Sequence, residues 1–204
     1  MAAKKLGLHI TYKHTGKMLH MQSLSTNCNT NPYCILHRKV KGSICAKCYA
    51  CAQTKRWKSM QEPLERNSEL LNGAVLDNDL IPTINASLFR FESFGDIGSV
   101  THVINLFNIC KANPKTEFAL WTKNPWLIDA AIKQGHAKPD NLVIIQSSMF
   151  INKRDVPKYD FIDKTFTVYD KNTDVEINCG ARSCITCQKC YHKNGIDDIR
   201  ELLK

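Results

Sequence analysis

Short apolar segments alternate with helical segments along the middle of this chain. Buried β-strands are predicted where apolar and β-branched residues cluster, and amphipathic helices where apolar residues recur at a helical period. The predicted strands are residues 18–24, 87–92, 117–122, 142–146 and 166–169, and the predicted helices are residues 44–60, 67–76, 100–112 and 126–134. This alternation favours an α/β protein with a parallel sheet.

The central predicted strands are almost continuously apolar, which is typical of a sheet with helices on both faces. About five or six strand–helix steps are too few for a complete eight-unit barrel. We therefore predict a partial or open parallel (β/α) barrel, related to a TIM barrel, over residues 1–178. Residues 179–204 are predicted to add a cysteine-rich cluster-binding segment to the same domain, with a short amphipathic helix over residues 196–203. Residues 25–42 read as a polar loop.

Nine of the ten cysteines fall into two groups near opposite ends of the chain. Thiolates two residues apart can bind one metal centre, because the intervening turn aims both sulfurs inward. The predicted ligands are Cys34, Cys45 and Cys48 in the first group, with Cys28 and Cys51 as candidate additional ligands, and Cys179, Cys184, Cys187 and Cys190 in the second. The tenth, Cys110, falls on the apolar face of a predicted helix and reads as a core residue.

Disulfides and zinc are the alternatives to iron–sulfur clusters. Residues 1–25 are basic and contain no long apolar run, so we expect no secretory signal, no membrane span and a cytoplasmic protein. Clustered cysteines in such a protein favour metal binding over disulfides. Zinc ribbons use two separated C-x2-C pairs, whereas Cys184, Cys187 and Cys190 form a continuous run like that of bacterial ferredoxins. This run favours iron–sulfur over zinc.

The two groups differ in the number of thiolates that they offer. Four thiolates saturate a [4Fe-4S] cluster, which then moves electrons or supports the structure. Three thiolates leave one iron open to a small molecule, by the logic that separates catalytic from structural zinc sites. The first group is open if only Cys34, Cys45 and Cys48 bind, and closed if Cys28 or Cys51 joins them.

Positive charge is concentrated around the first cysteine group. The net charge is +9, and residues 1–61 hold eleven Lys or Arg and no Asp or Glu. These cations can offset an anionic cluster and lower thiolate pKa values. They can also bind the carboxylate or phosphate of a small molecule, or a nucleic-acid backbone, and a solvated basic face is the plainest alternative.

Polar residues stand at the carboxyl ends of several predicted strands, where parallel α/β folds place functional groups. Ser23 and the cysteine loop follow the first strand, and residues 92–96 follow the second. The third strand ends at Thr122 and Lys123, and Ser147 and Ser148 follow the fourth. We expect these positions to converge beside the first cysteine group.

Five segments together resemble a known family. They are Cys45–Ala50, Glu65–Asn67, Phe89–Ile97, Phe118–Pro125 and Cys179–Cys190. In this combination the chain resembles radical S-adenosylmethionine proteins, and it looks most similar to the small phage and prophage proteins of the gene-product-eighty-eight family. The resemblance covers most of the chain, and for a viral protein it implies the host cytoplasm.

The radical S-adenosylmethionine resemblance implies two [4Fe-4S] clusters, an external electron donor and oxidoreductase or lyase chemistry on a small-molecule or macromolecular substrate. S-adenosylmethionine would bind the open iron, and one electron would cleave a carbon–sulfur bond to release an adenosyl radical. The residues that would contact it are Glu92, Gly95 and Asp96 for the ammonium group, Arg90 or Lys123 for the carboxylate, and Ser147 at the same strand ends. The alternatives are a non-catalytic iron–sulfur redox or nucleic-acid-binding protein, and a zinc structural protein.

Overall fold

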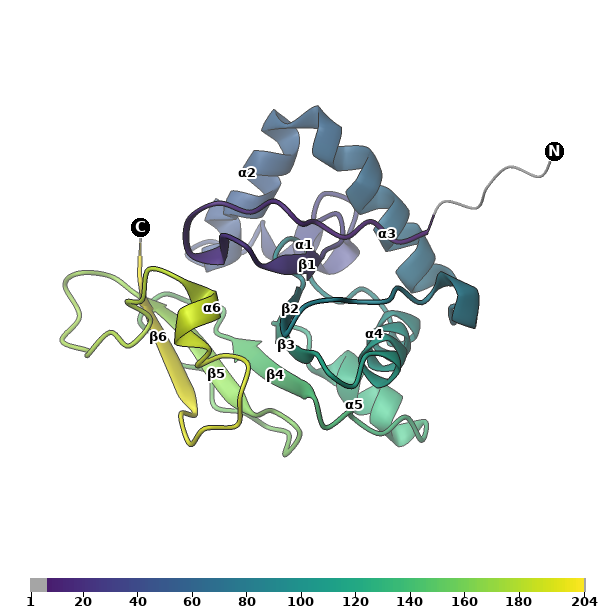
Figure 1. The fold of residues 1–204 in the computed structure, drawn as a ribbon. Helices are drawn as coiled ribbons and strands as arrows, with labels where there is room; N and C mark the ends of the chain where they lie inside the picture. The colour runs from purple at the N-terminus through teal and green to yellow at the C-terminus, as the bar shows by residue number, and fades with distance from the viewer. Residues whose placement is uncertain (1–6, 204) are drawn as a thin grey trace.

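The computed structural model describes residues 7–203, so Lys4 and Lys5 of the basic N-terminal third lie outside the described residues. It is an α/β protein with an open six-stranded sheet whose strands lie in chain order, each parallel to its neighbour (Figure 1). The strands are β1 (Gln22–Leu24), β2 (Leu88–Phe91), β3 (Glu117–Thr122), β4 (Leu142–Ser147), β5 (Lys164–Tyr169) and β6 (Asp198–Leu202).

Six α-helices and four short 3₁₀ helices connect these strands in the described residues. The α-helices are α1 (Pro32–His37), α2 (Tyr49–Arg56), α3 (Gln61–Gly73), α4 (Val100–Ala112), α5 (Trp126–Lys133) and α6 (Cys184–Cys187). The 3₁₀ helices are Gly16–Met18, Ile44–Lys47, Lys58–Met60 and Asn78–Leu80. The predicted parallel α/β class is confirmed, and α4 and β3 have the predicted bounds.

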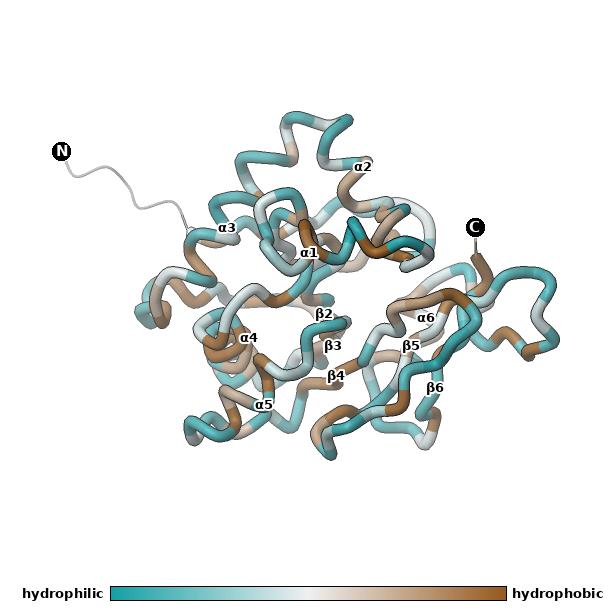
Figure 2. Tube along the Cα trace, turned by 180° about the vertical axis from the view of Figure 1, so that it is seen from behind, coloured by the Kyte–Doolittle hydropathy of each residue, from teal (hydrophilic) through white to brown (hydrophobic). Residues whose placement is uncertain are grey.

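Three helices cover one face of the sheet, which we call the helix face. Alternate strand residues point to it, as the period of two requires: Phe89 and Phe91 in β2, and Phe118 and Leu120 in β3. They pack against α3, α4 and α5 in a single buried cluster. Seen from behind, hydrophobic residues lie along this part of the chain, and hydrophilic ones along the outer corner between α2 and α3 (Figure 2).

The opposite face, which we call the inner face, presents the other set of strand side chains: Met21, Leu88, Ala119, Val143 and Ile145. The expectation that helices cover both faces is wrong, because this face is covered mainly by the C-terminal cysteine segment. Tyr191 is buried against it, and Cys184, Ile185 and Cys190 pack around the same cluster. Only the single-turn helix α6 in this segment is helical, and it lies over the sheet (Figure 1).

Two local predictions are corrected. The tail is strand β6 rather than a helix over residues 196–203, because Ile199 is 1% exposed and pairs in register with Phe166 of β5. Isoleucines three residues apart suit a helix locally, but pairing with β5 satisfies the backbone instead. The loop over residues 25–42 contains α1, because the Asn31 side chain accepts hydrogen bonds from Tyr33 N and Cys34 N and Pro32 follows it.

Among residues 7–203, no helix has both the length and the apolar character that crossing a membrane requires.

The β6 pairing predicts that two side-chain substitutions by alanine in the tail lower the free energy of unfolding by unequal amounts. Ile199→Ala removes a buried side chain and should lower the free energy of unfolding by about 2–4 kcal/mol. Leu202→Ala is the matched control: its residue is 45% exposed in the same strand, so we expect a loss within about 1 kcal/mol. Urea unfolding measures both, and equal losses would contradict the assignment of β6.

Candidate functional site

The strand ends β1 to β4 meet at one edge of the sheet, which we call the carboxyl edge, and Asp96 is its most connected side chain. Asp96 Oδ1 accepts hydrogen bonds from Thr122 Oγ1 at 2.5 Å and Ile97 N at 2.8 Å. Its Oδ2 accepts one from Lys123 N at 2.9 Å. The carbonyl oxygen of Asp96 accepts one from Asn31 Nδ2 at 2.7 Å. Asp96 thus joins the loop after β2 to the end of β3 and to the cap of α1.

Burial raises the pKa of Asp96 to about 6, and its hydrogen bonds from Thr122 and Lys123 oppose the rise. A carboxyl group whose pKa is higher in the folded than in the unfolded state stabilises the fold below the unfolded pKa. That contribution is lost as the pH rises through about 6.

Glu92 is a second buried carboxylate at this edge and has internal partners. Its Oε2 accepts a hydrogen bond from Thr26 Oγ1 at 2.8 Å, and its Oε1 lies 3.3 Å from Nε2 of the fully buried His102. Because His102 Nδ1 accepts from Gly98 N at 3.2 Å, its proton is assigned to Nε2, facing Glu92. Glu92 has a φ of 51°, a left-handed conformation that non-glycine residues rarely adopt.

Gly95 is required by its close packing against Thr26 and Glu92. It has a φ of +83°, and a Cβ added there would lie 2.5 Å from Thr26 Oγ1, 2.8 Å from Thr26 O and 2.8 Å from Glu92 Oε2. A side chain would therefore push the loop after β1, where the cysteines begin, away from the loop after β2.

Helix α3 anchors the start of the cysteine loop. Asn67 is fully buried, and its Nδ2 donates to His9 O and Ser25 O, both at 2.9 Å. Two residues earlier in α3, Glu65 Oε2 accepts from Asn27 Nδ2 at 2.7 Å and from Thr30 Oγ1 at 2.8 Å. The segment Glu65–Asn67 is one of the five that carry the family resemblance, and in the structure it positions the chain around Cys28.

The five cysteines of the first group, which we call the N-terminal thiol group, converge beside the carboxyl edge. Cys28 and Cys51 are buried in one cluster with Ala50, and Cys34 and Cys48 pack against it. Burial raises the pKa of the Cys45 thiol, which is close enough to Cys48 and Cys51 for their charge to raise it further. Cys28 and Cys51 are 1% and 5% exposed, so the two candidate additional ligands lie inside the group.

Cys48 is the best-stabilised thiolate of the N-terminal thiol group. A hydrogen bond from the Cys28 thiol is the main cause that lowers its pKa, and the backbone N–H groups of Cys51 and Ala50 add to it. These N–H groups belong to the first turn of α2, where a helix favours negative charge. By contrast, burial raises the pKa of Cys34 and of Cys45, and at Cys45 the charge of Lys123 opposes the rise.

The four cysteines of the second group, which we call the C-terminal thiol group, gather where the inner face is covered. Cys184 and Cys187 begin and end α6, and Gln188 closes it in a left-handed conformation with a φ of 56°. Cys179 is placed by β6, because its N donates to Arg200 O at 3.0 Å. Burial raises the pKa of Cys190 to about 12, and the neighbouring thiol of Cys179 raises it further.

The predicted ligand-binding residues do not all lie together. Glu92, Gly95 and Asp96 share the carboxyl edge, and Lys123 is half-buried there, near Cys45. Ser147 is nearly buried at the end of β4. Arg90 instead lies on the inner face, where its guanidinium carbon is 4.1 Å from the centroid of the Trp121 ring. Whether any of these residues contacts a cofactor stays a prediction.

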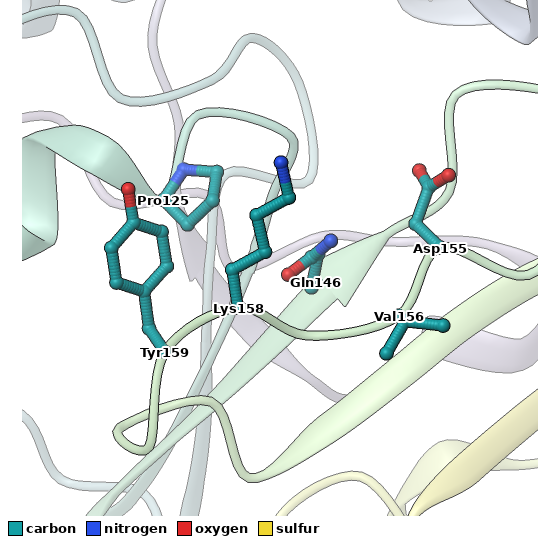
Figure 3. A pocket seen from close by; sticks show the side chains of 6 residues that line it. All are labelled: Pro125, Gln146, Asp155, Val156, Lys158 and Tyr159. Carbon is teal, nitrogen blue, oxygen red and sulfur yellow. The ribbon is translucent and has the colours of Figure 1, made fainter.

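A pocket of about 390 Å³ opens beside β4, where a loop connects β4 to β5 (Figure 3). Figure 3 shows Lys158 and Tyr159 on one side of Gln146, and Asp155 and Val156 on the other. Gln146 points to the side of β4 opposite Ser147, because successive strand residues alternate. None of the predicted site residues lines this pocket.

All ten cysteines are free thiols in the structure. Within residues 7–203, no three Cys, His, Asp or Glu side chains form a site of the size that a single metal ion needs. The thiol groups are therefore described by their convergence, and metal binding at either group is a proposal.

Sequence patterns did not identify several of the residues that hold the site together. Thr26 donates a hydrogen bond to the Glu92 carboxylate, and His102 Nε2 lies 3.3 Å from it. Lys17 Nζ donates to Cys179 O at 2.8 Å, although the two residues are 162 positions apart. A helix-capping signal at Asn31-Pro32 was present in the sequence and could have located α1. No local pattern indicates the partners of Thr26, His102 or Lys17, because these contacts span long sequence separations.

The fold and the site define a parallel α/β protein with two separate groups of free thiols. The model of the family described as gene product 88 matches residues 3–201, and the chain belongs to this family. This confirms the gene-product-eighty-eight part of the resemblance, whereas the radical S-adenosylmethionine part stays a prediction. Neither a curated protein nor a solved structure matches the chain.

The crowding around Gly95 predicts that Gly95→Ala is more destabilising than Gly135→Ala, which serves as its control. Gly135→Ala should cost about 1–2 kcal/mol of unfolding free energy, because Gly135 also has a positive φ, +91°, but an added Cβ would meet nothing within 4 Å. Gly95→Ala adds the collisions with Thr26 and should cost a further 1–3 kcal/mol or so. Chemical denaturation measures both variants, and equal costs would show that Gly95 is needed for its backbone conformation alone.

Proposed function

We propose that this protein is an iron–sulfur protein that holds two clusters. The observation that supports it best is the convergence of nine free thiols into two groups, one at the carboxyl edge of a parallel sheet and one over its inner face. Under this proposal the open sheet is a partial (β/α) barrel, and an external electron donor reduces the clusters.

We assign the first cluster to Cys34, Cys45 and Cys48, and the second to the four cysteines of the C-terminal thiol group. A cluster with three thiolates leaves one iron open, and S-adenosylmethionine bound there would supply radical chemistry of the oxidoreductase or lyase type. Cys28 and Cys51 are close enough to Cys48 to close the first cluster, so their role decides between an enzyme and an electron carrier.

The residues at the carboxyl edge divide into two roles in this proposal. Asp96 and Glu92 already accept hydrogen bonds from Thr122, Lys123 N and Thr26, so they hold the cysteine loop in place. The Lys123 side chain is half-buried beside Cys45, and its charge is placed to attract the carboxylate of a ligand on the open iron.

Cysteine substitutions test the number of clusters. Anaerobically prepared protein should contain about eight irons per chain, with sulfide and a broad visible band near roughly 400 nm. Paired Cys45→Ala and Cys48→Ala substitutions should remove about half of the iron, and paired Cys184→Ala and Cys187→Ala substitutions the other half. Iron and sulfide analysis of each variant measures this.

Cys110→Ala is the matched control, because Cys110 is fully buried in the helix-face cluster, away from both thiol groups. It should keep all the iron. A colourless protein that holds zinc and no sulfide would overturn the proposal.

A second experiment tests whether the first cluster has an open iron. S-adenosylmethionine should change the spectrum of the reduced cluster in Cys28→Ala and Cys51→Ala but not in Cys34→Ala. Loss of the first cluster in Cys28→Ala or Cys51→Ala would show instead that the site is closed by that cysteine.

A second candidate function, binding of single-stranded nucleic acid, is favoured by the corner between α2 and α3. Trp57 is 54% exposed there, and Lys55, Arg56 and Lys58 beside it are exposed as well. The Arg56 guanidinium carbon lies 5.4 Å from the Trp57 ring centroid. This corner protrudes from the rest of the molecule (Figure 1). Exposed aromatic rings between cations suit base stacking beside a phosphate backbone.

Under this second candidate, the logarithm of the binding constant for a single-stranded oligonucleotide should fall linearly with the logarithm of salt concentration. Trp57→Ala should weaken binding by about 1–3 kcal/mol through lost stacking. Trp126→Ala is the control, because Trp126 is 47% exposed but lies outside the basic corner. Fluorescence anisotropy measures each affinity, and equal losses in the two variants would rule out this surface.

A further inference from the structure

Arg90 is a cation on the inner face with no carboxylate partner. Among residues 7–203 its guanidinium forms no ion pair; it stacks on Trp121 and donates from Nη1 to Met18 Sδ at 3.5 Å. Its Nε is buried without a hydrogen-bond partner. Holding a guanidinium in a partly apolar setting is unfavourable unless negative charge lies nearby.

The C-terminal thiol group packs against the same part of the inner face as Arg90. Trp121, on which Arg90 stacks, packs with its ring centroid 6.1 Å from that of Tyr191. Cys184 and Cys190 pack into the same inner-face cluster as Trp121. Arg90 and these two thiols therefore lie around the same aromatic pair, Trp121 and Tyr191.

Lys17 is the second cation of this group. Its Nζ lies 3.5 Å from Cys179 Sγ and donates to Cys179 O at 2.8 Å. It also pairs with Glu201 Oε1 at 2.9 Å, so part of its charge is already offset. Lys17 reaches the group from the segment before β1, whereas Glu201 belongs to β6.

We propose that Arg90 and Lys17 are the counter-ions of a metal centre held by the C-terminal thiol group. Four thiolates around a divalent ion or a doubly charged [4Fe-4S] core leave a net charge of about −2, which two cations can offset. Arg90 carries the larger share, because no carboxylate within residues 7–203 pairs with it. For an iron–sulfur centre this inference rests on the proposed function; for a divalent ion it does not.

Cobalt(II) provides a test that does not depend on iron or sulfide. In the full chain with Cys34, Cys45 and Cys48 replaced by Ala, Co²⁺ should bind the C-terminal thiol group with thiolate-to-metal absorption. This binding requires the four thiols to close around the ion, because in residues 7–203 they do not yet form a single-ion site. Arg90→Met should weaken this binding about tenfold, because it removes one positive charge beside the site. Arg90→Lys should keep most of the affinity, and Lys17→Met should weaken it by less than Arg90→Met does.

Lys115→Met is the matched control, because Lys115 is exposed before β3, at the end of the sheet opposite the carboxyl edge. It should bind Co²⁺ as the parent does. Equal affinity in Arg90→Met and the parent would overturn the inference, as would equal weakening in Arg90→Met and Arg90→Lys, which would show that packing on Trp121 matters and charge does not. Absence of Co²⁺ binding in the parent would also overturn it.

The iron-loaded chain supplies a second readout. Arg90→Met should disfavour the more negative reduced state of the second cluster about tenfold at a fixed potential, a shift of about 59 mV to lower potential for a one-electron couple. Lys115→Met should leave it unchanged. If the unmodified chain holds no sulfide, the proposed function fails, and the Co²⁺ affinities still decide the role of Arg90.

Discussion

The buried carboxylate of Asp96 is the contact on which the arrangement of the carboxyl edge depends. Its two oxygens bind the end of β3 through Thr122 Oγ1 and Lys123 N, and its carbonyl oxygen binds Asn31, the cap of α1. Because α1 contains Cys34, the position of that thiol depends on this junction. Glu92 adds a parallel link to Thr26, two residues before Cys28. Buried carboxylates thereby join the N-terminal thiol group to the sheet.

The two thiol groups have different physical settings. The N-terminal group lies in a loop and a helix start, where backbone N–H groups and neighbouring thiols stabilise Cys48 as a thiolate. The C-terminal group lies against an apolar sheet face, and the Lys17 side chain stands 3.5 Å from Cys179 Sγ. Burial opposes thiolate formation in both settings, so each needs its own source of positive potential. In the proposed function the number of thiolates, three against four, separates a cluster with an open iron from a saturated one.

Much of the fold could be predicted from local patterns. Helix α4 and strand β3 have the predicted bounds, because a strong apolar period and the cap at Ser99 specify them locally. The tail could not be predicted, because Ile196 and Ile199 suit a helix and only pairing with β5 makes the segment a strand. At the site, the convergence of Glu92, Asp96 and Thr122 follows from parallel strand ends. The placement of Arg90 on the inner face required the strand register.

The sequence by itself determined the parallel α/β class, the two cysteine groups and the concentration of positive charge near the first group. These features depend on residue type and short spacing, so they can be read locally. Only the tertiary structure decided which face the C-terminal cysteines cover, which thiols Cys48 contacts, and which cations stand beside Cys179 and Cys190. Those contacts join residues up to 162 positions apart, as Lys17 and Cys179 are. Such pairs form because packing of the sheet brings distant residues into contact, and local sequence preferences do not indicate which residues will pair.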